Sequence, residues 1–287
     1  MPFMFRKMVV AGVGLTGGSL ALAARKFGLV DEIVGYGRGE KNLRLARRNG
    51  VIDRYFMDER KVPNGVDLLI LATPVQSIAP LAKSFLPGLR PSCLVSDVGS
   101  VKANVVHQVE RVVARRADFV GAHPIAGGEQ WGAQAARSDL FIGHRCILTP
   151  TRNTNPRALR KMTTFWRRLG SKVEIMDPRA HDRILALVSH LPHVLVYSLV
   201  NSLREARVDS LDLKEYCAGG FKDFTRIASS RPEIWRDICL DNPQAITKGI
   251  VDYVKRLEKV KRWIQDGRGD LLEKEFQRAN EFRSAIP

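Results

Sequence analysis

The glycine-rich motif GVGLTG at residues 12–17 constrains the fold of this chain more than any other feature. It follows a short apolar run and leads into a helical pattern, as in the strand, turn and helix of a dinucleotide-binding unit. Gly12 permits the tight turn, Gly14 lets the backbone approach a pyrophosphate, and Gly17 lets helix and strand pack closely. A flexible glycine loop is the alternative, but the flanking elements favour a nucleotide site contacted by Gly12, Gly14, Leu15 and Gly17.

The first part of the chain alternates strand-like and helix-like segments. Strand patterns lie at 8–11, 33–36, 66–72, 93–96, 119–122, 146–149 and 172–176, and helical patterns at 18–27, 41–48 and 101–115. A further helix lies between the last two strands, where Asn155 can cap its start, Pro156 suits its first turn and Gly170 follows its end. This alternation predicts an α/β domain with a doubly wound, mostly parallel, Rossmann-like sheet.

The pattern changes near Asp177 and Pro178. Beyond this point only helical patterns occur, at 179–206, 213–218, 232–239 and 243–266, and Pro192 should kink the first of them. We therefore predict a dinucleotide-binding domain at 1–178 and an all-helical domain at 179–287 that binds substrate and forms a dimer, the last by fold-level analogy. Such a pair suggests a dehydrogenase whose substrate lies between the two domains.

Charge, hydropathy and cysteine spacing further limit the kinds of protein that this chain can be. The net charge is +16, but Lys and Arg are spread along the chain, which favours a solvated surface, then attraction of anionic small molecules, over nucleic acid. The most apolar run, 184–200, is interrupted by His190, Pro192 and His193, so we expect no membrane span. The cysteines lie apart at Cys93, Cys146, Cys217 and Cys239, so we expect neither disulfides nor zinc, and a cytoplasmic location.

The end of the second predicted strand bears on the choice of dinucleotide. An Asp or Glu usually stands there and binds the adenosine ribose, whereas this chain has Gly37 followed by Arg38. Glycine leaves room for a 2′-phosphate and Arg38 can pair with it, with Lys41 nearby. We therefore favour NADP over NAD. The alternative is that Arg38 is a surface residue of a turn.

Two loops at predicted strand ends carry candidates for proton chemistry. His123 lies in GAHPIAGGE at 121–129, where open α/β sheets bind ligands, and can act as acid or base. The alternative is a histidine that only satisfies a turn. In DVGSVK at 97–102, Ser100 can hydrogen-bond a substrate oxygen or orient His123, or simply cap a helix. We expect Lys102 to be a solvated charge.

The helical region carries two further clusters. SHLPH at 189–193 places His190 and His193 on one helix face, where packing is the stronger interpretation and zinc would need more ligands. In GGFKDFTRIA at 219–228, Arg226 lies among small and apolar residues, which suits a partly buried guanidinium that grips a carboxylate. The alternative is an internal salt bridge from Arg226 to Asp223 or Glu129.

Seven short segments occur together along nearly the whole chain: GVGLTG at 12–17, LATPV at 71–75, DVGSVK at 97–102, GAHPIAG at 121–127, SHLPH at 189–193, FTRIA at 224–228 and WRD at 235–237. In this order they resemble the prephenate/arogenate dehydrogenase family of tyrosine biosynthesis. The resemblance implies oxidation of a ring carbinol, hydride transfer to NAD(P), and loss of the ring carboxylate as the ring becomes aromatic.

The resemblance also implies roles for individual residues. His123 would be the base, and Ser100 would bind the ring hydroxyl and align His123. Arg226 would bind a substrate carboxylate in a pocket lined by His193, Trp235 and Gly219. Thr73 and Pro74 would contact the cofactor, no metal would be needed, and the chain would form a homodimer. Many members keep the acid that Gly37 replaces here, which puts NAD in doubt but not the reaction.

Several alternatives stay open at this point. The substrate could be prephenate, arogenate or an amino-substituted prephenate. A β-hydroxyacid dehydrogenase or an imine reductase also joins a nucleotide domain to helices, but the loop of His123 argues against both. A non-enzymatic NADP-sensing regulator on nucleic acid lacks any helix-turn-helix or zinc-finger signal. We expect no chorismate mutase or regulatory domain, so that tyrosine would inhibit only by competing at the active site.

Overall fold

The structure is a computed structural model that describes residues 3–114, 116–128, 130–208 and 211–286. The chain separates into two compact units, Met1–Asn242 and Pro243–Pro287. The predicted boundary near Pro178 lies inside the first unit and stays a prediction.

The first unit is built on an eight-stranded sheet with the order β3-β2-β1-β4-β5-β6-β7-β8. Its strands are β1 (Phe5–Ala11), β2 (Val30–Tyr36), β3 (Arg54–Phe56), β4 (Leu68–Leu71), β5 (Leu94–Asp97), β6 (Asp118–Pro124), β7 (Arg145–Thr149) and β8 (Lys172–Ile175). All neighbours run parallel except β6 and β7. The strand order reverses at β1, so the predicted doubly wound fold is confirmed and a ligand crevice is expected where β1 and β4 end.

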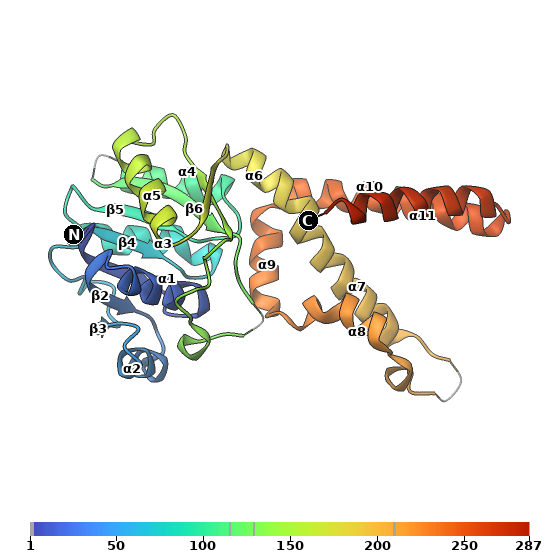
Figure 1. Cartoon of the computed structure of the whole chain (residues 1–287), viewed down its shortest axis with the longest axis horizontal. Helices are drawn as coiled ribbons and strands as arrows, with labels where there is room; N and C mark the ends of the chain where they lie inside the picture. The colour runs from blue at the N-terminus through green and yellow to red at the C-terminus, as the bar shows by residue number, and fades with distance from the viewer. Residues whose placement is uncertain (1–2, 115, 129, 209–210, 287) are drawn as a thin grey trace. The chain divides into compact units, whose positions relative to one another are not determined.

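In the first unit, helices flank the sheet (Figure 1). Those of the first unit are α1 (Leu15–Lys26), α2 (Glu40–Arg48), α3 (Val75–Phe85), α4 (Ala103–Val113), α5 (Pro156–Arg168), α6 (Pro178–Leu185), α7 (Leu191–Glu205), α8 (Gly219–Thr225) and α9 (Pro232–Asp241). The second unit consists of α10 (Pro243–Gln265) and α11 (Gly269–Ser284), which contact each other. The predicted helix at 101–115 ends at Val113, and Arg115 lies outside the described residues.

Alternation along the central strands divides the core into two layers. Met8 and Val10 of β1 belong to one fully buried cluster with Leu20 of α1 and Phe165 of α5. Val9 is equally buried but lies outside that cluster, because successive strand residues point to opposite faces. Burial on both faces explains why β1 and β4 read as continuous apolar runs.

The sequence predicts a kink at Pro192, and the helical segment Pro178–Glu205 carries a π-helical turn just before that residue. The segment runs through 28 residues, and a π-helical turn at Ala186–His190 separates α6 from α7. Pro192 has no N–H to donate to the carbonyl of Val188, and the wider π turn accommodates that missing bond. The turn also carries His190 into the buried interior.

The remaining differences concern short elements. The predicted helix at 213–218 is a 3₁₀ turn, η4 (Leu213–Tyr216), and α8 begins only at Gly219. The predicted Asn155 cap is confirmed: its side chain accepts a hydrogen bond from the Arg157 N–H, with Pro156 in the first turn. The sequence patterns did not predict β3, α3, α8 or α11.

Candidate functional site

A cavity of about 540 Å³ opens at the carboxyl ends of β1, β2 and β4. Of the predicted cofactor residues, it is lined by Gly12, Gly14, Arg38, Thr73 and Pro74, and its lining does not include Leu15 or Gly17. Its wall also contains Glu59, Trp131 and Arg231, which the sequence analysis did not single out. The position matches the crevice at which the strand order reverses.

The three glycines of the loop have different reasons to be glycine. Gly12 has φ +97°, and a Cβ there would lie 2.3 Å from the carbonyl oxygen of Ala72. A Cβ on Gly17 would lie 2.1 Å from the carbonyl oxygen of Gly12, so this residue allows α1 to pack against the turn. A Cβ on Gly14 would meet nothing within 4 Å, because Gly14 borders the open cavity. Its missing side chain leaves space for a ligand.

The cavity fits the phosphates and polar groups of a dinucleotide. The N-terminus of α1 has no side-chain cap at Gly14 and no acidic residue in its first turn, so its free N–H groups suit an anion. The hydroxyl oxygen of Thr73 is buried and has no hydrogen-bond partner among the described residues. Buried polar groups are rarely left unpaired, which indicates that a bound group completes this wall.

The end of β2 brings two opposite charges to the same cavity. Arg38 is exposed and Gly37 beside it has only ordinary contacts with Leu43, so the wall is open there. The Tyr36 hydroxyl donates to Glu59 Oε1 at 2.8 Å. Burial and the Glu59 carboxylate raise the pKa of Tyr36 to about 12. No sequence pattern pointed to Glu59, since it lies in a loop 23 residues from Tyr36.

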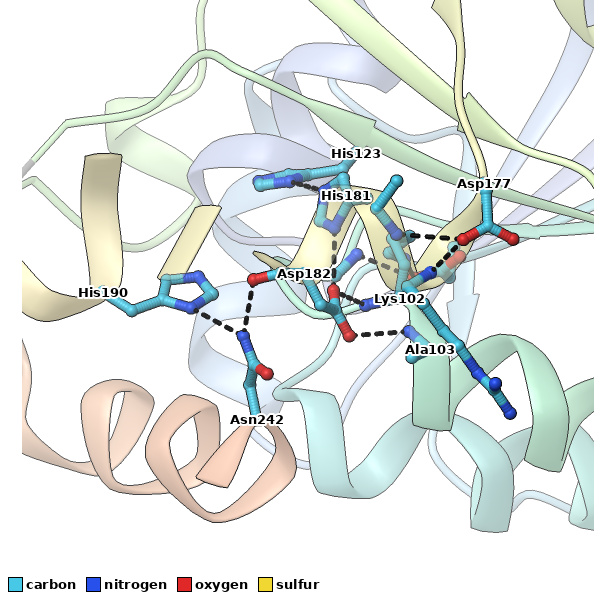
Figure 2. Close-up of polar contacts among 12 residues, drawn as sticks. Lys102, Ala103, His123, Asp177, His181, Asp182, His190 and Asn242 are labelled. Atoms are coloured by element: carbon cyan, nitrogen blue, oxygen red, sulfur yellow. Dashed lines mark hydrogen bonds and ion pairs between the residues drawn. The ribbon is translucent and has the colours of Figure 1, made fainter. Parts of the chain in front are cut away.

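His123 lies near the end of β6, not after it, and begins a buried hydrogen-bonded chain (Figure 2). Its Nδ1 lies 2.8 Å from Nε2 of His181, and Nδ1 of His181 lies 2.8 Å from Oδ1 of Asp182. The Asp182 carboxylate accepts hydrogen bonds of 2.8 Å from the backbone N–H groups of Lys102 and Ala103. The sequence analysis missed His181 and Asp182, which occur as an ordinary His-Asp pair in a helix.

The ring of His123 is held neutral. Burial lowers its pKa well below the ordinary value of about 6.5, and the nearby His181, Lys102 and His190 lower it further. Burial also lowers the pKa of His181, although the hydrogen bond to Asp182 acts in the opposite direction. At neutral pH His123 therefore presents an unprotonated nitrogen, as a general base requires.

Lys102 is not the solvated charge that the sequence suggested. Its side chain and that of Asp97 are fully buried and form an ion pair. Asp97 also accepts hydrogen bonds from the backbone N–H groups of Gly99 and Ala122. A buried lysine needs such a partner, because an unpaired charge is strongly disfavoured in the interior. The pair ties the loop after β5 to β6, two residues before the end of that strand.

Ser100 does not cap α4. Lys102 occupies the N-cap position, and the carboxylate of Asp182, 80 residues away in the sequence, accepts from the first N–H groups instead. Ser100 is half-buried, and among the described residues no hydrogen bond joins its hydroxyl to His123. Both residues lie close to His190: burial lowers the pKa of His190 to about 4 while the Ser100 backbone opposes that shift, and His190 adds to the lowering of the His123 pKa that burial mainly causes.

The predicted residues of the helical region form a second group. His193 stacks on Trp235 with ring centroids 3.4 Å apart, and His190 contacts the same indole from 6.4 Å. Arg226 lies close enough to His193 to lower the pKa of that ring, after the larger effect of burial. The structure thus brings His193, Trp235 and Arg226 together, while exposed Gly219 starts α8.

Arg226 lies on the surface of the first unit. The prediction that its guanidinium is partly buried is wrong. Arg226 is exposed because it begins the surface turn η5 (Arg226–Ser229) after α8. Glu129, one of the two salt-bridge partners considered for it, lies outside the described residues.

Comparison with known proteins gives consistent matches over nearly the whole chain. Residues 20–175 match the family model described as prephenate dehydrogenase, nucleotide-binding domain, and residues 177–278 match prephenate dehydrogenase, dimerization domain. The chain is 32% identical to a prephenate dehydrogenase of Bacillus subtilis over 281 residues, which is 98% of this chain and 76% of the relative.

Two solved structures extend these matches. One is prephenate dehydrogenase from Aquifex aeolicus in complex with hydroxyphenyl propionate and NAD⁺, with a TM-score of 0.94, 35% identity and 98% of both chains covered. The other is an arogenate dehydrogenase from Synechocystis, with a TM-score of 0.81, 27% identity, and 98% of this chain and 100% of the other covered.

Proposed function

This chain belongs to the prephenate dehydrogenase family, and we propose which of its residues perform the reaction. It is an NAD(P)-dependent oxidoreductase that converts prephenate to 4-hydroxyphenylpyruvate by oxidative decarboxylation, in tyrosine biosynthesis. The observation that carries the assignment of residues is His123. It is buried and neutral, and it lies at the same sheet edge as a cavity suited to a dinucleotide.

His123 acts as the general base. A bound nicotinamide supplies the acceptor for the hydride that leaves the ring carbinol carbon. As that carbon becomes electron-poor, His123 takes the proton of the ring hydroxyl and relieves the developing positive charge. The bond to the ring carboxylate breaks, its electron pair enters the ring, and carbon dioxide leaves. The proton can return from His123 to the oxygen of the aromatic product.

The other predicted residues bind and orient the substrate. Ser100 binds the ring hydroxyl and aligns it with His123, since both residues lie around His190. Arg226 binds a substrate carboxylate. His193 and Trp235 form an aromatic wall beside Arg226, and Gly219 completes the pocket at the start of α8.

We propose that NADP is the preferred dinucleotide. Gly14, Leu15 and Gly17 would place the pyrophosphate at the start of α1, beside Gly12, Thr73 and Pro74. Arg38 would pair with the 2′-phosphate in the space that Gly37 leaves open. NAD is the alternative, and it is favoured by Glu59, whose carboxylate reaches the same cavity and could replace the acid missing from the end of β2.

Prephenate is the proposed substrate. Arogenate is the alternative, because the similar structure from Synechocystis is an arogenate dehydrogenase. The two differ in the side chain, which is pyruvyl in prephenate and alanyl in arogenate. Amino-substituted prephenates belong to the same chemical class. A cytoplasmic location accords with the four cysteines, which are free thiols.

We also propose a homodimer formed through the helical region, whose sequence matches a dimerisation domain. The segment Pro178–Glu205 is long and apolar enough to cross a membrane by length and composition, with a mean hydropathy of 1.5, and 28% of its most apolar window is buried. A second copy of the chain, rather than lipid, would cover Ile184, Leu187 and Val188, which are exposed on it.

Four parallel assays test the reaction, the substrate and the cofactor. Purified protein is mixed with prephenate or arogenate, each with NAD or NADP, and the absorbance of reduced nicotinamide is followed. We expect the fastest turnover with prephenate and NADP. Turnover with NAD alone would contradict the role of Arg38, and faster turnover of arogenate would contradict the substrate. No turnover in any of the four assays would contradict the reaction itself.

Two variants separate the two cofactor hypotheses. Arg38→Ser should raise the KM for NADP by about tenfold or more and leave that for NAD unchanged, because a charged hydrogen-bonded pair contributes about 1.5–3 kcal/mol. Glu59→Gln is the matched variant on the opposite charge. If Glu59→Gln raises the KM for NAD while Arg38→Ser leaves the KM for NADP unchanged, the proposed preference for NADP is wrong.

A further inference from the structure

The chain of hydrogen bonds behind His123 fixes more than its position (Figure 2). Asp182 is an acceptor for three donors: the N–H groups of Lys102 and Ala103 and Nδ1 of His181. A carboxylate carries no proton to donate, so the proton in the contact with His181 must lie on Nδ1 of the histidine. The other tautomer would direct the lone pair of His181 Nδ1 at a carboxylate oxygen.

The tautomer of His181 determines that of His123. A neutral imidazole carries one N–H, so with Nδ1 protonated the Nε2 of His181 is an acceptor. Its neighbour at 2.8 Å is Nδ1 of His123, which must then be the donor. This leaves the lone pair of His123 on Nε2, and both rings are neutral because burial lowers their pKa values.

We propose that His181 is a positioning residue for the reaction: it holds His123 in the tautomer whose Nε2 accepts the proton of the substrate hydroxyl. Asp182 anchors His181 against the start of α4, so the orientation of the base is set by a helix terminus of the sheet-bearing region. When His123 takes the proton and becomes positively charged, the hydrogen bonds through His181 connect it to the negatively charged Asp182 carboxylate. The proposal rests on His123 being the base.

Two substitutions at His181 each keep one of its two contacts, with Asp182 or with His123, and remove the other. In His181→Asn the amide takes the place of Nδ1, so it can still donate to Asp182 but cannot reach His123. In His181→Gln the amide reaches the place of Nε2, so its oxygen can still accept from His123 Nδ1. A residue needed only for packing and for the start of α4 would tolerate Asn at least as well as Gln. His107→Gln, at an exposed histidine on α4, is the matched control.

Steady-state kinetics give the first comparison. We expect His181→Asn to lower kcat by about 10²-fold with little change in KM, because a base in the wrong tautomer loses most of the gain from proton transfer. His181→Gln should keep most of the kcat, and His107→Gln should match the parent chain. Equal losses in the Asn and Gln variants, or a change confined to KM, would overturn the proposal.

Nitrogen NMR on chain with ¹⁵N-labelled histidine gives a readout that needs no turnover. His123 is assigned by the signals that disappear in His123→Asn. We expect Nδ1 of His123 to be protonated and Nε2 unprotonated in the parent chain and in His181→Gln, and a mixture of tautomers in His181→Asn. A proton on Nε2 of His123 in the parent chain overturns the proposal, whatever the enzyme does. The expected tautomer in a chain that turns over neither substrate would instead contradict the function proposed for His123.

Discussion

At the scale of single residues, substitutions of His123 and of Arg226 are expected to change different kinetic constants. The base acts only as the hydride leaves, so His123→Asn should lower kcat by about 10²–10⁴-fold and change KM little. Arg226 holds a carboxylate in the ground state and transition state alike, so Arg226→Ala should mainly raise KM. Steady-state kinetics with prephenate separate the two cases. If His123→Asn raised KM and Arg226→Ala lowered kcat, both assignments would be wrong.

The buried His190 makes stability depend on pH. Burial lowers its pKa to about 4, against about 6.5 in an unfolded chain, although Asp182 opposes the shift. The unfolded state therefore takes up a proton first as the pH falls. This stability is fully present above about pH 6.5 and is lost progressively as the pH falls to about 4, by about 3 kcal/mol at most.

Replacement of that ring by a side chain that does not titrate tests the prediction. Urea unfolding of His190→Met between pH 7 and 4 should show a shallower loss of free energy than the parent chain, by the amount that His190 contributes. His107→Met, at an exposed histidine, is the control and should keep the parent slope. Parallel curves for His190→Met and the parent chain would contradict the assigned cause.

Which residues could be found from sequence follows from where their partners lie. His123 was accessible because a histidine at a strand end beside Pro and Gly has few structural reasons to be there. His181 and Asp182 were not, because their roles depend on contacts with Lys102 and His123, some 58 to 80 residues away. Lys102 was misjudged for the same reason: only the fold buries it against Asp97.

At the scale of elements, the loop between β1 and α1 separates folding from binding. Gly17→Ala would place a methyl group 2.1 Å from the Gly12 carbonyl oxygen, so it should destabilise the fold by about 1–3 kcal/mol. Gly14→Ala has open space and φ −104°, so the fold should keep its Tm while the methyl group enters the space for the pyrophosphate. Thermal unfolding and titration with NADPH fluorescence measure the two effects. A stable Gly14→Ala that binds NADPH normally would contradict the placement of the cofactor.

Most periodic elements could be predicted, but α3 was missed although its buried Ile78, Ala82 and Phe85 recur at helical spacing, because Pro80 inside it argues against a helix. The central strands β1, β4 and β5 were visible as apolar runs because both of their faces are buried. The last helix, α11, was missed although Leu272, Phe276 and Ala279 recur at helical spacing; none of its residues is buried. The three residues of β3 are too few for alternation to show. The π turn at Ala186–His190 could be located only through Pro192, since sequence shows where a helical bond is missing but not how the backbone replaces it.

At the scale of the whole molecule, the exposed apolar face of Pro178–Glu205 is expected to hold two chains together. In the single chain Val188 is 68% exposed and Leu187 is 59% exposed, although both side chains are apolar. In a two-fold interface each substitution acts twice, and a buried charge without a partner is strongly disfavoured. Val188→Glu should therefore raise the dimer dissociation constant by at least about 10²-fold, as measured by sedimentation equilibrium. His107→Glu places the same charge on an exposed position of α4 and should leave the dimer intact. A parent chain that sediments as a monomer, or a Val188→Glu variant that remains dimeric, would show that this face has another role.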